Sequence, residues 1–587
     1  MARTFAQQLV QYLEDQGVQR IYGLVGDSLN PISDAVSDSG IEWVHVRNEE
    51  AAAFAAGAES LVTGELAVCA GSCGPGNTHF VQGLFDAHRN GARVLALASH
   101  IPSLQIGSSF FQETHPELLF RECSGYLEMV NSPEQGARIL HHAVQSTMAG
   151  KGVSVLVLPG DISAEEAGEE RFLNSTIARG RPVAYPDARE AAALVDAVNA
   201  AEKVTLFCGA GVKDAREQVL ALAEKIKSPI GHAFGGKMYI QYDNPFDVGM
   251  SGLLGYGAAT QAMEEADLLI LLGTDFPYQD WLPSKNVAQI DLDASHIGRR
   301  TTVKYPVVGD VVATLDNVLP HIAEKGDRSF LDRMLSEHAR LLDGVVGNYS
   351  GKAGRRKPIH PEYVAALIDE LADDDALFTV DTGMCNVWAA RYVTPNGRRG
   401  DIGSYKHGTM ANAIPQAIGA QFADRSRQVV TFSGDGGTAM LLSELLTVKL
   451  HRLPIKMVVF NNSSLGMVKL EMMVAGMPDF GTDHEQVNFA DIAAAIGIRA
   501  IRVEVPRKVE KALTEAFAHD GPVLVDVVTD PDALSIPPNV TWDMMMGFSK
   551  TAAKTVLDGG VGRMVDLARS NLRNIGAAAS VKKGRRT

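Results

Sequence analysis

The stretch from Val429 to Asn462 constrains the fold more than any other part of the chain. An apolar, β-prone run leads into Ser433-Gly434-Asp435-Gly436-Gly437, and a helical apolar pattern then continues to Leu450. After Leu453-Pro454, a second apolar run ends in Asn461-Asn462. Strand, helix and strand in this order predict one unit of a parallel sheet.

Two oxygen-bearing side chains, Asp435 and Asn462, end these expected strands, 27 residues apart. Open α/β sheets bind ligands at this carboxyl edge, where glycines allow a close approach and the next helix turns its N–H groups toward an anion. A carboxylate, an amide and a diphosphate make an all-oxygen site suited to Mg²⁺ or Ca²⁺. A capping Asp in an ordinary turn explains Gly-Asp-Gly-Gly equally well, and the Asn-Asn pair at this spacing favours the metal–diphosphate site.

A second candidate group lies nearer the N-terminus. The apolar run Trp43–Arg47 ends in Asn48-Glu49-Glu50, and an alanine-rich helical segment, 51–58, follows. A carboxylate in this position is poorly solvated and can exchange a proton with a cofactor ring nitrogen. Without further support, helix capping by acidic residues of a first turn is the commoner explanation.

Length and patterning predict a multidomain α/β protein. The 587 residues suffice for three or four domains, and the alternation of apolar runs with helical patterns predicts parallel sheets with helices on both faces. We place domains at 1–182, 183–335 and 336–530, and a tail at 531–587.

Composition narrows the function classes and the compartment. The formal charge of -16 argues against nucleic-acid binding. The five cysteines form no Cys-x-x-Cys pair, which favours a reducing compartment. No apolar run is long enough to span a bilayer, so we expect a cytoplasmic protein.

The tail has a different character. Basic residues outnumber acidic ones from Lys550 onward, and apolar residues from Val561 to Ile575 follow helical spacing. A basic amphipathic helix can lie on an anionic lipid surface. A terminal helix docked on its own domain is an equally good alternative.

Several runs together resemble thiamine-diphosphate-dependent decarboxylases along the whole chain, and above all the pyruvate oxidases and bacterial pyruvate:quinone oxidoreductases. The runs are Val46–Glu50, Gly71–Asn77, Phe111–Pro116, Gly408–Asn412, Gly434–Gly437 and Asn461–Gly466. The resemblance implies three doubly wound parallel-sheet domains, which bind the thiamine pyrimidine, FAD and the diphosphate in that order, and a C-terminal helical tail. It also implies a homodimer as the minimum and usually a tetramer, with each active site shared between the first domain of one subunit and the third domain of another.

The resemblance assigns residues to the thiamine site. Glu49 would hydrogen-bond the aminopyrimidine ring, Gly408 would accept from its amino group, and Met410 would hold the cofactor bent. Asp435, Asn462 and the Ser464 carbonyl would ligate Mg²⁺. Core packing is the alternative for Met410. Further implied contacts to thiamine diphosphate are Thr409, Gly436, Gly437, Ser463, Leu465, Gly466, Met467 and Val468.

The remaining assignments concern the substrate and FAD. Phe111, Gln112, Met467 and Glu471 would act in catalysis: Phe111 matches an aromatic residue near both cofactors, Gln112 would face the thiazolium or the substrate, and Glu471 matches an active-site acid. Core packing is the alternative for Phe111 and a solvated helix face for Glu471. Gly209-Ala210-Gly211 is only a weak dinucleotide signal. The implied FAD contacts are Ser251, Gly252, Leu253, Leu254, Thr274, Asp275, Phe276, Pro277, Tyr278 and Asp291.

The implied reaction is oxidative decarboxylation of pyruvate to acetate and CO₂ through a hydroxyethyl-thiamine intermediate, with electrons passing through FAD to a membrane quinone. The protein would then be peripheral on the cytoplasmic face of the membrane. Two departures from relatives are Asn48, where His is frequent, and Met467, where Phe is found, which bears on the rate or the acceptor. Acetolactate synthase and an oxygen- and phosphate-dependent pyruvate oxidase are the alternatives. A non-enzymatic subunit would have lost Glu49 or a metal ligand, and we interpret His141-His142 as structural.

Overall fold

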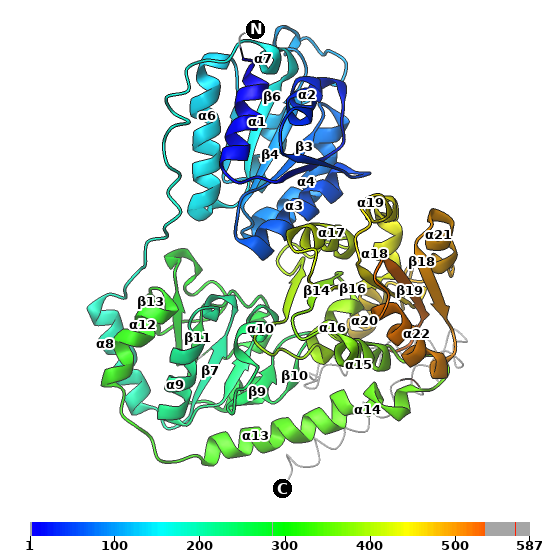
Figure 1. Ribbon diagram of the computed structural model, residues 1–587. Helices are drawn as coiled ribbons and strands as arrows, with labels where there is room; N and C mark the ends of the chain where they lie inside the picture. The colour runs from blue at the N-terminus through cyan, green and yellow to red at the C-terminus, as the bar shows by residue number, and fades with distance from the viewer. Residues whose placement is uncertain (1–2, 285, 534–569, 571–587) are drawn as a thin grey trace.

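Three domains, each built on one sheet, make up the chain. The computed structural model describes residues 3–284, 286–533 and 570. In Figure 1 the first domain lies above, and the central and third domains lie side by side below it. The three sheets confirm the predicted fold class. Most of the predicted tail, 534–569 and 571–587, lies outside the described residues.

The first domain holds a six-stranded parallel sheet in the order β2-β1-β3-β4-β6-β5. Its strands are β1 (Arg20–Gly23), β2 (Glu42–His45), β3 (Ala67–Gly71), β4 (Val94–His100), β5 (Tyr126–Met129) and β6 (Ser154–Pro159). Its helices are α1 (Phe5–Asp15), α2 (Asn30–Ser37), α3 (Glu49–Thr63), α4 (Pro75–Asn90), α5 (Pro116–Leu119), α6 (Pro133–Ser146) and α7 (Gly160–Ala164).

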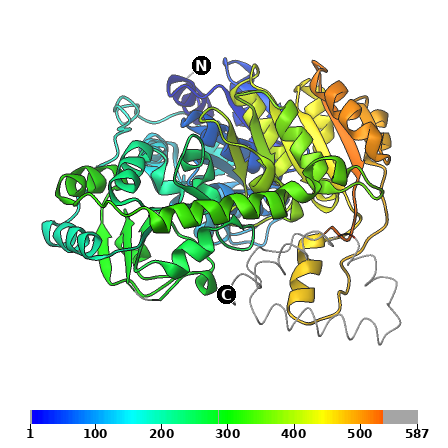
Figure 2. The ribbon, with the colours of Figure 1, turned by 90° about the horizontal axis from the view of Figure 1, so that it is seen from below.

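The central domain holds a seven-stranded sheet in the order β10-β9-β8-β7-β11-β12-β13, in which the short edge strand β10 is antiparallel. Its strands are β7 (Val204–Cys208), β8 (Ile230–His232), β9 (Asp247–Met250), β10 (Tyr256–Gly257), β11 (Leu268–Leu272), β12 (Val287–Asp291) and β13 (Tyr305–Val308). Its helices are α8 (Ala188–Ala200), α9 (Arg216–Ile226), α10 (Lys237–Ile240), α11 (Ala259–Glu265) and α12 (Val311–Val318). Helix α13 (Ser329–Leu341) then runs toward the third domain, as Figure 2 shows from below.

The third domain repeats the strand order of the first. Its sheet runs β15-β14-β16-β17-β19-β18, so its strands, counted along the chain, occupy the same places. The strands are β14 (Leu377–Val380), β15 (Gly400–Gly403), β16 (Val429–Gly434), β17 (Lys456–Asn461), β18 (Arg499–Val503) and β19 (Val523–Val528). The helices are α14 (Gly347–Ser350), α15 (Pro361–Leu371), α16 (Met384–Tyr392), α17 (Ala413–Ala423), α18 (Asp435–Met440), α19 (Glu444–Leu450), α20 (Gly466–Val474), α21 (Phe489–Ile496) and α22 (Val509–Phe517).

Small residues bring the first and third domains together. Helix α3 packs along α17, and a Cβ atom on Gly419 would lie only 1.9 Å from the Ala55 carbonyl oxygen. Tyr22 and Phe422 pack edge to face across the same boundary, with ring centroids 5.9 Å apart. A single buried apolar cluster therefore spans both domains.

The sequence located most of the longer buried strands, and β7 and β11 have the predicted bounds. The strands that were missed are short or carry exposed or polar residues: β5, β8, β9, β10, β13, β15 and β18. The single helix predicted after Asp435 was wrong: it is divided into α18 and α19 around Leu441, whose φ/ψ of -121°/39° is not helical. Within the described residues, none of the helices has the length and apolar character needed to cross a bilayer.

Candidate active site

The third sheet has its topological switch point between β14 and β16. The next strand along the chain, β15, lies on one side of β14, and the strand after it, β16, lies on the other side. Doubly wound sheets bind ligands at the carboxyl edge at such a point. Helix α16 begins after β14 and α18 begins after β16, so both N-termini face this edge. A Cβ atom on Gly434 would lie 3.8 Å from the Cys385 Sγ atom, which brings the two helix starts together.

This switch point is open and lined by polar atoms without partners. Gly383, at φ 134°, has no atom within 4 Å of the position of a Cβ. The buried hydroxyls of Thr382 and Thr438 and the Asn386 Oδ1 atom have no hydrogen-bond partner. Buried polar groups are nearly always paired, so these atoms are suited to a polar ligand such as a diphosphate.

The two predicted metal ligands with side-chain oxygens meet at this edge. Asp435 Oδ2 accepts a hydrogen bond of 2.5 Å from the Ser463 backbone N–H, and Ser463 directly follows Asn462. Asn462 Oδ1 accepts from the Ser464 N–H at 3.2 Å, and the Ser464 carbonyl accepts from the Gly466 N–H at 2.9 Å. Burial raises the pKa of the Asp435 carboxyl, and the nearby His484 side chain partly offsets this increase. The donor set is carboxylate, amide and carbonyl oxygen, which fits Mg²⁺. The ligand role of these residues stays a prediction.

Met410 lies beside the glycine turn that follows β16, and its role as a wedge stays a prediction. A Cβ atom on Gly436 would lie 3.0 Å from Met410 Cε and 3.1 Å from Leu465 Cδ2. Gly437 must lack a side chain, because its Cβ would lie 2.0 Å from Asp381 Oδ2. Apolar side chains thus cover the glycine turn beside Asp435, and Gly408 has free space around it at φ 77°.

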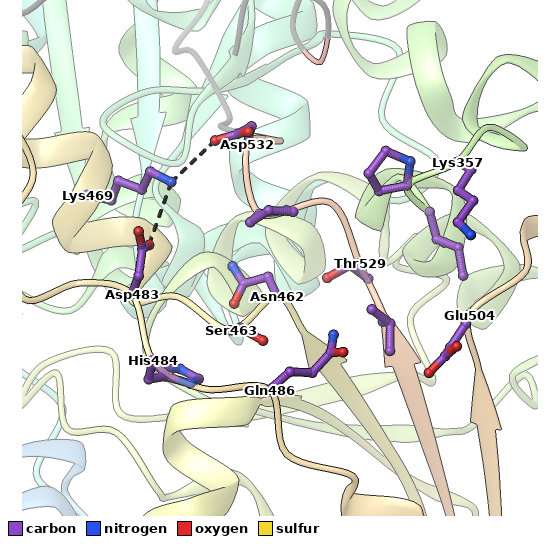
Figure 3. A pocket seen from close by; sticks show the side chains of 14 residues that line it. Lys357, Asn462, Ser463, Lys469, Asp483, His484, Gln486, Glu504, Thr529 and Asp532 are labelled. Atoms are coloured by element: carbon purple, nitrogen blue, oxygen red, sulfur yellow. Dashed lines mark hydrogen bonds and ion pairs between the residues drawn. The ribbon is translucent and has the colours of Figure 1, made fainter. Parts of the chain in front are cut away.

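A cavity of about 830 Å³ opens beside this edge, at the ends of β17, β18 and β19. Figure 3 shows Asn462 and Ser463 on its wall together with His484 and Lys469. His484 Nε2 lies 3.7 Å from Asp435 Oδ1, and Lys469 Nζ lies 3.3 Å from Asp532 Oδ1. The cavity therefore joins the predicted metal ligands to a charged rim.

The first domain gathers its own candidate residues around one turn, Gly74-Pro75-Gly76. Glu49, the first residue of α3, is buried, and its Oε2 atom lies 2.8 Å from His79 Nδ1. A Cβ atom on Gly76 would lie 3.0 Å from Glu49 Oε1, and one on Gly74 would lie 2.8 Å from Gln112 Cβ. The structure therefore brings Glu49 and Gln112 to the same turn, while the sharing of the site between subunits stays a prediction.

Contacts within the chain connect this group to the third domain. Gln82 Nε2 donates to Thr409 Oγ1 at 2.6 Å, one turn of α4 after His79. The Arg47 backbone N–H donates to Glu444 Oε1 at 3.0 Å. Burial raises the pKa of Glu444 to about 7. The segment that carries Glu49 is thus held by α19, the second helix after Asp435.

The central sheet has its switch point between β7 and β11, and two of the predicted FAD segments, 251–254 and 274–278, contact each other at its carboxyl edge. A Cβ atom on Gly209 would lie 2.4 Å from the Gly273 carbonyl oxygen. Gly252, at φ 97°, faces Tyr278 and Phe276, whose ring atoms lie 2.8 and 3.0 Å from its Cβ position. Loops 251–254 and 274–278 therefore contact each other, and their binding of FAD stays a prediction. Asp275 pairs with Arg300 at 3.2 Å, and Asp291 ends β12.

The other predicted substrate residues lie at the margins. Phe111 is 77% exposed. Met467 packs against the third-domain core together with Leu254 of the central domain, and Val468 is partly exposed. Glu471 is exposed on α20. Burial raises the pKa of the Tyr278 hydroxyl, and the Glu471 carboxylate adds to this increase. Glu471 therefore lies near Tyr278 of the central domain. His141 contacts Tyr12 on α1 at 3.2 Å, a structural position as expected.

Sequence reasoning missed several polar residues of the site. His79 lies three residues after Gly76, and a lone His in the first turn of a helix after a buried strand was the available signal. Thr382, Asn386 and Thr438 are common helix-start residues with no distinguishing pattern. His484 follows no strand, so only the fold reveals its place beside Asp435.

Comparison with known proteins agrees with this architecture. Family models match in order the N-terminal TPP binding domain (residues 3–118), the central domain (191–318) and the C-terminal TPP binding domain (381–527) of thiamine pyrophosphate enzymes. The chain is 33% identical to the putative thiamine pyrophosphate-containing protein YdaP of Bacillus subtilis, over 97% of this chain and 99% of that protein.

Two other relatives carry the names of enzymes. The pyruvate oxidase of Lactiplantibacillus plantarum is 28% identical over 89% of this chain and 88% of its own length. The acetolactate synthase isozyme 2 large subunit of Escherichia coli is 30% identical over 89% of this chain and 95% of its own length. With three matching domains in order and a full-length relative, the chain belongs to the thiamine pyrophosphate enzyme family.

Proposed function

We propose that this enzyme oxidatively decarboxylates pyruvate, with thiamine diphosphate and Mg²⁺ at the switch point of the third domain and FAD at that of the central domain. The observation that carries the proposal is the open switch point, where Asp435 and Asn462 meet unpaired polar atoms and Met410 covers Gly436. Bound thiamine diphosphate supplies a carbon nucleophile and an electron sink for decarboxylation.

The residues of this chain would bind and orient the cofactor and its metal, and one of them would transfer a proton. Asp435, Asn462 and the Ser464 carbonyl hold the metal, and the N-termini of α16 and α18 receive the diphosphate. Met410 and Leu465, which lie against Gly436, would hold the cofactor in position. Glu49 exchanges a proton with the pyrimidine ring, and His79 at 2.8 Å orients its carboxyl group. Gln112 faces the substrate.

Electron transfer to FAD distinguishes the proposal from simple decarboxylation. Loops 251–254 and 274–278 contact each other, and Glu471 of α20 lies close enough to Tyr278 to affect its pKa. The relative named pyruvate oxidase supports pyruvate as the substrate. The domain bounds we propose are 1–182, 183–335, 336–530 and 531–587.

A membrane quinone is the proposed electron acceptor, and the basic amphipathic segment around Val561–Ile575 supports it. With a peripheral position on an anionic bilayer, the enzyme would meet the quinone directly. Acetolactate synthase is the second candidate, because a relative of that name matches equally well. An oxygen- and phosphate-dependent pyruvate oxidase is the third.

One assay separates these functions. The purified protein is loaded with thiamine diphosphate, Mg²⁺ and FAD, and products from pyruvate are measured with a quinone, with oxygen, and with oxygen plus phosphate. We expect acetate and reduced quinone. Acetolactate as the main product would favour the synthase, and acetyl phosphate with peroxide would favour the oxidase. No turnover of pyruvate under any condition would overturn the proposal.

We also propose that each active site is shared between two chains. A Glu49→Gln chain and an Asp435→Asn chain, each inactive alone, are co-expressed with different tags and the mixed dimer is isolated. One of its two shared sites then has both residues intact, so it should regain about half the activity of a wild-type dimer. An inactive mixed dimer would place both residues of each site on one chain.

A further inference from the structure

Helix α16 runs from the proposed thiamine diphosphate site to the central domain. At its N-terminus, a Cβ atom on Gly466 would lie 3.0 Å from Met384 Cγ and 3.2 Å from Asn462 Nδ2. At its C-terminus, the last carbonyls are buried against the central domain. A helix is stiff along its axis because every turn is hydrogen-bonded, so a change at one end is transmitted to the other.

A buried lysine of the central domain caps the C-terminal end. Lys237, on α10, is 1% exposed, and its Nζ atom donates to the Ala390 carbonyl at 2.7 Å and to the Val393 carbonyl. A cation at this end also interacts favourably with the helix dipole. Removal of the ammonium group would leave buried carbonyls unpaired, which is costly.

An arginine of α16 makes the reciprocal contact. Arg391 is 6% exposed, and its Nη2 atom donates to the Gly255 carbonyl at 2.9 Å, while Nε donates to the Leu254 carbonyl at 3.4 Å. These carbonyls belong to the loop in which Gly252 contacts Tyr278. The two cationic side chains therefore tie α16 to the central domain in both directions.

We propose that Lys237 and Arg391 are positioning residues, through which α16 couples occupancy of the thiamine diphosphate site to the conformation of residues 251–257 in the central domain. A diphosphate bound at the N-terminus of α16 fixes the helix along its axis. The fixed C-terminus then orders the loop through the two cations. The proposal rests on the proposed function, because it takes thiamine diphosphate as the ligand at α16.

Hydrogen–deuterium exchange of the full chain tests the coupling without an assay of turnover. Thiamine diphosphate with Mg²⁺ is added to the flavin-free protein, and exchange is followed at 383–387, 434–437 and 251–257. We expect slower exchange at all three segments, by about fivefold at 251–257, a typical size for coupling between sites. In Lys237→Met, protection should persist at the first two segments and disappear at 251–257.

A matched control separates coupling from general destabilisation. Lys325 also belongs to the central domain, and its Nζ atom donates to the Val198 carbonyl at 2.8 Å and to the Ala201 carbonyl, which cap α8 far from the site. Lys325→Met should lower the melting temperature but keep protection at 251–257. If Lys237→Met does not fold, Arg391→Lys provides the second test, because it keeps the charge but loses the forked contact.

The outcomes separate this inference from the proposed function. An absence of protection at 383–387 and 434–437 in the wild type would overturn the thiamine diphosphate site and the inference with it. Protection there without protection at 251–257 would overturn the coupling alone. Equal protection at 251–257 in the wild type, Lys237→Met and Arg391→Lys would show that neither cation carries it.

Discussion

The first and third domains share one strand order but differ at the switch point that this order creates. In the first domain the chain fills the point itself: a Cβ atom on Gly26 would lie 2.5 Å from Ser72 Cβ, and the Cys73 N–H donates to the Ser28 hydroxyl at 3.0 Å. In the third domain the equivalent point, around Gly383 and Gly434, is open. One topology thus serves two purposes, because the loops at its carboxyl edge decide whether a ligand fits.

The difference extends to the catalytic groups. In the first domain, Glu49 begins the helix after the second strand and lies beside the turn Gly74-Pro75-Gly76. In the third domain, the Asp435 carboxylate follows the third strand and the Asn462 amide follows the fourth strand. We infer that one domain holds the metal and the diphosphate while the other supplies the proton-transfer group.

The largest effect should follow from a change to that proton-transfer group. Glu49→Gln keeps the size of the side chain but removes its acid–base function, so pyruvate turnover should fall by about 10²–10⁴-fold. The melting temperature should stay close to that of the wild type. Steady-state kinetics and thermal unfolding measure the two quantities.

A second glutamate on the same helix is the control. Glu59 of α3 accepts a hydrogen bond of 2.5 Å from the Tyr22 hydroxyl and pairs with Arg20. Glu59→Gln should lower stability and leave the turnover of the folded enzyme unchanged. Undiminished turnover in Glu49→Gln would show that Glu49 is not the proton-transfer group.

A pair of alanine substitutions compares the filled and open switch points directly. Gly26→Ala should destabilise the protein by about 1–3 kcal/mol, because the extended backbone tolerates alanine but Ser72 occupies the space of the new methyl group. Gly434→Ala has 3.8 Å of clearance, so its stability should change by about 0.5 kcal/mol or less.

The same pair should behave in the opposite way in cofactor binding. Gly434→Ala places its methyl group toward α16, so thiamine diphosphate should bind about tenfold more weakly, a loss of about 1.4 kcal/mol. Gly26→Ala should keep the wild-type affinity in the folded fraction. Equal changes in stability for both variants would mean that the two switch points are packed alike.

A smaller effect concerns the contact between the two domains. Burial raises the folded-state pKa of Glu444 to about 7, above its ordinary value of 4.5. The folded state therefore binds more protons than the unfolded state between about pH 4.5 and 7, and stability falls as the pH rises through this window. Above about pH 7 both states are ionised and this contribution stays constant.

Glu444→Gln removes the titrating group but can still accept from the Arg47 N–H. The variant should gain stability over the wild type as the pH rises from 5 to 7.5, by about 1–3 kcal/mol at the upper end. Denaturant unfolding at several pH values measures the difference. A difference that does not change with pH would show that Glu444 does not titrate in this range.

Much of the fold followed from the sequence because buried parallel strands are nearly continuous apolar runs. Val204–Cys208 and Leu268–Leu272 were predicted with their observed bounds. Edge strands such as Arg499–Val503 alternate charged and apolar residues, so they were not recognised. The break at Leu441 was missed because its side chain fits the apolar pattern of a continuous helix.

The candidate site was predicted only where residues carry a pattern along the chain. Asp435 and Asn462 follow buried strands at a recognisable spacing, and the structure brings their segments together. The pairing of His79 with Glu49, the support of Arg47 by Glu444 and the capping of α16 by Lys237 join residues distant in sequence. Such contacts depend on how helices pack, which the local pattern does not contain.

Binding of thiamine diphosphate to the full chain tests the central claim most directly. Isothermal titration in the presence of Mg²⁺ compares the wild type with Asp435→Asn, and Asp424→Asn, which changes an Asp at a turn after α17, is the control. We predict that Asp435→Asn weakens binding by about 100-fold or more, since a ligand to the metal is lost, while Asp424→Asn binds as the wild type does. Equal affinities for the wild type and Asp435→Asn would contradict the account.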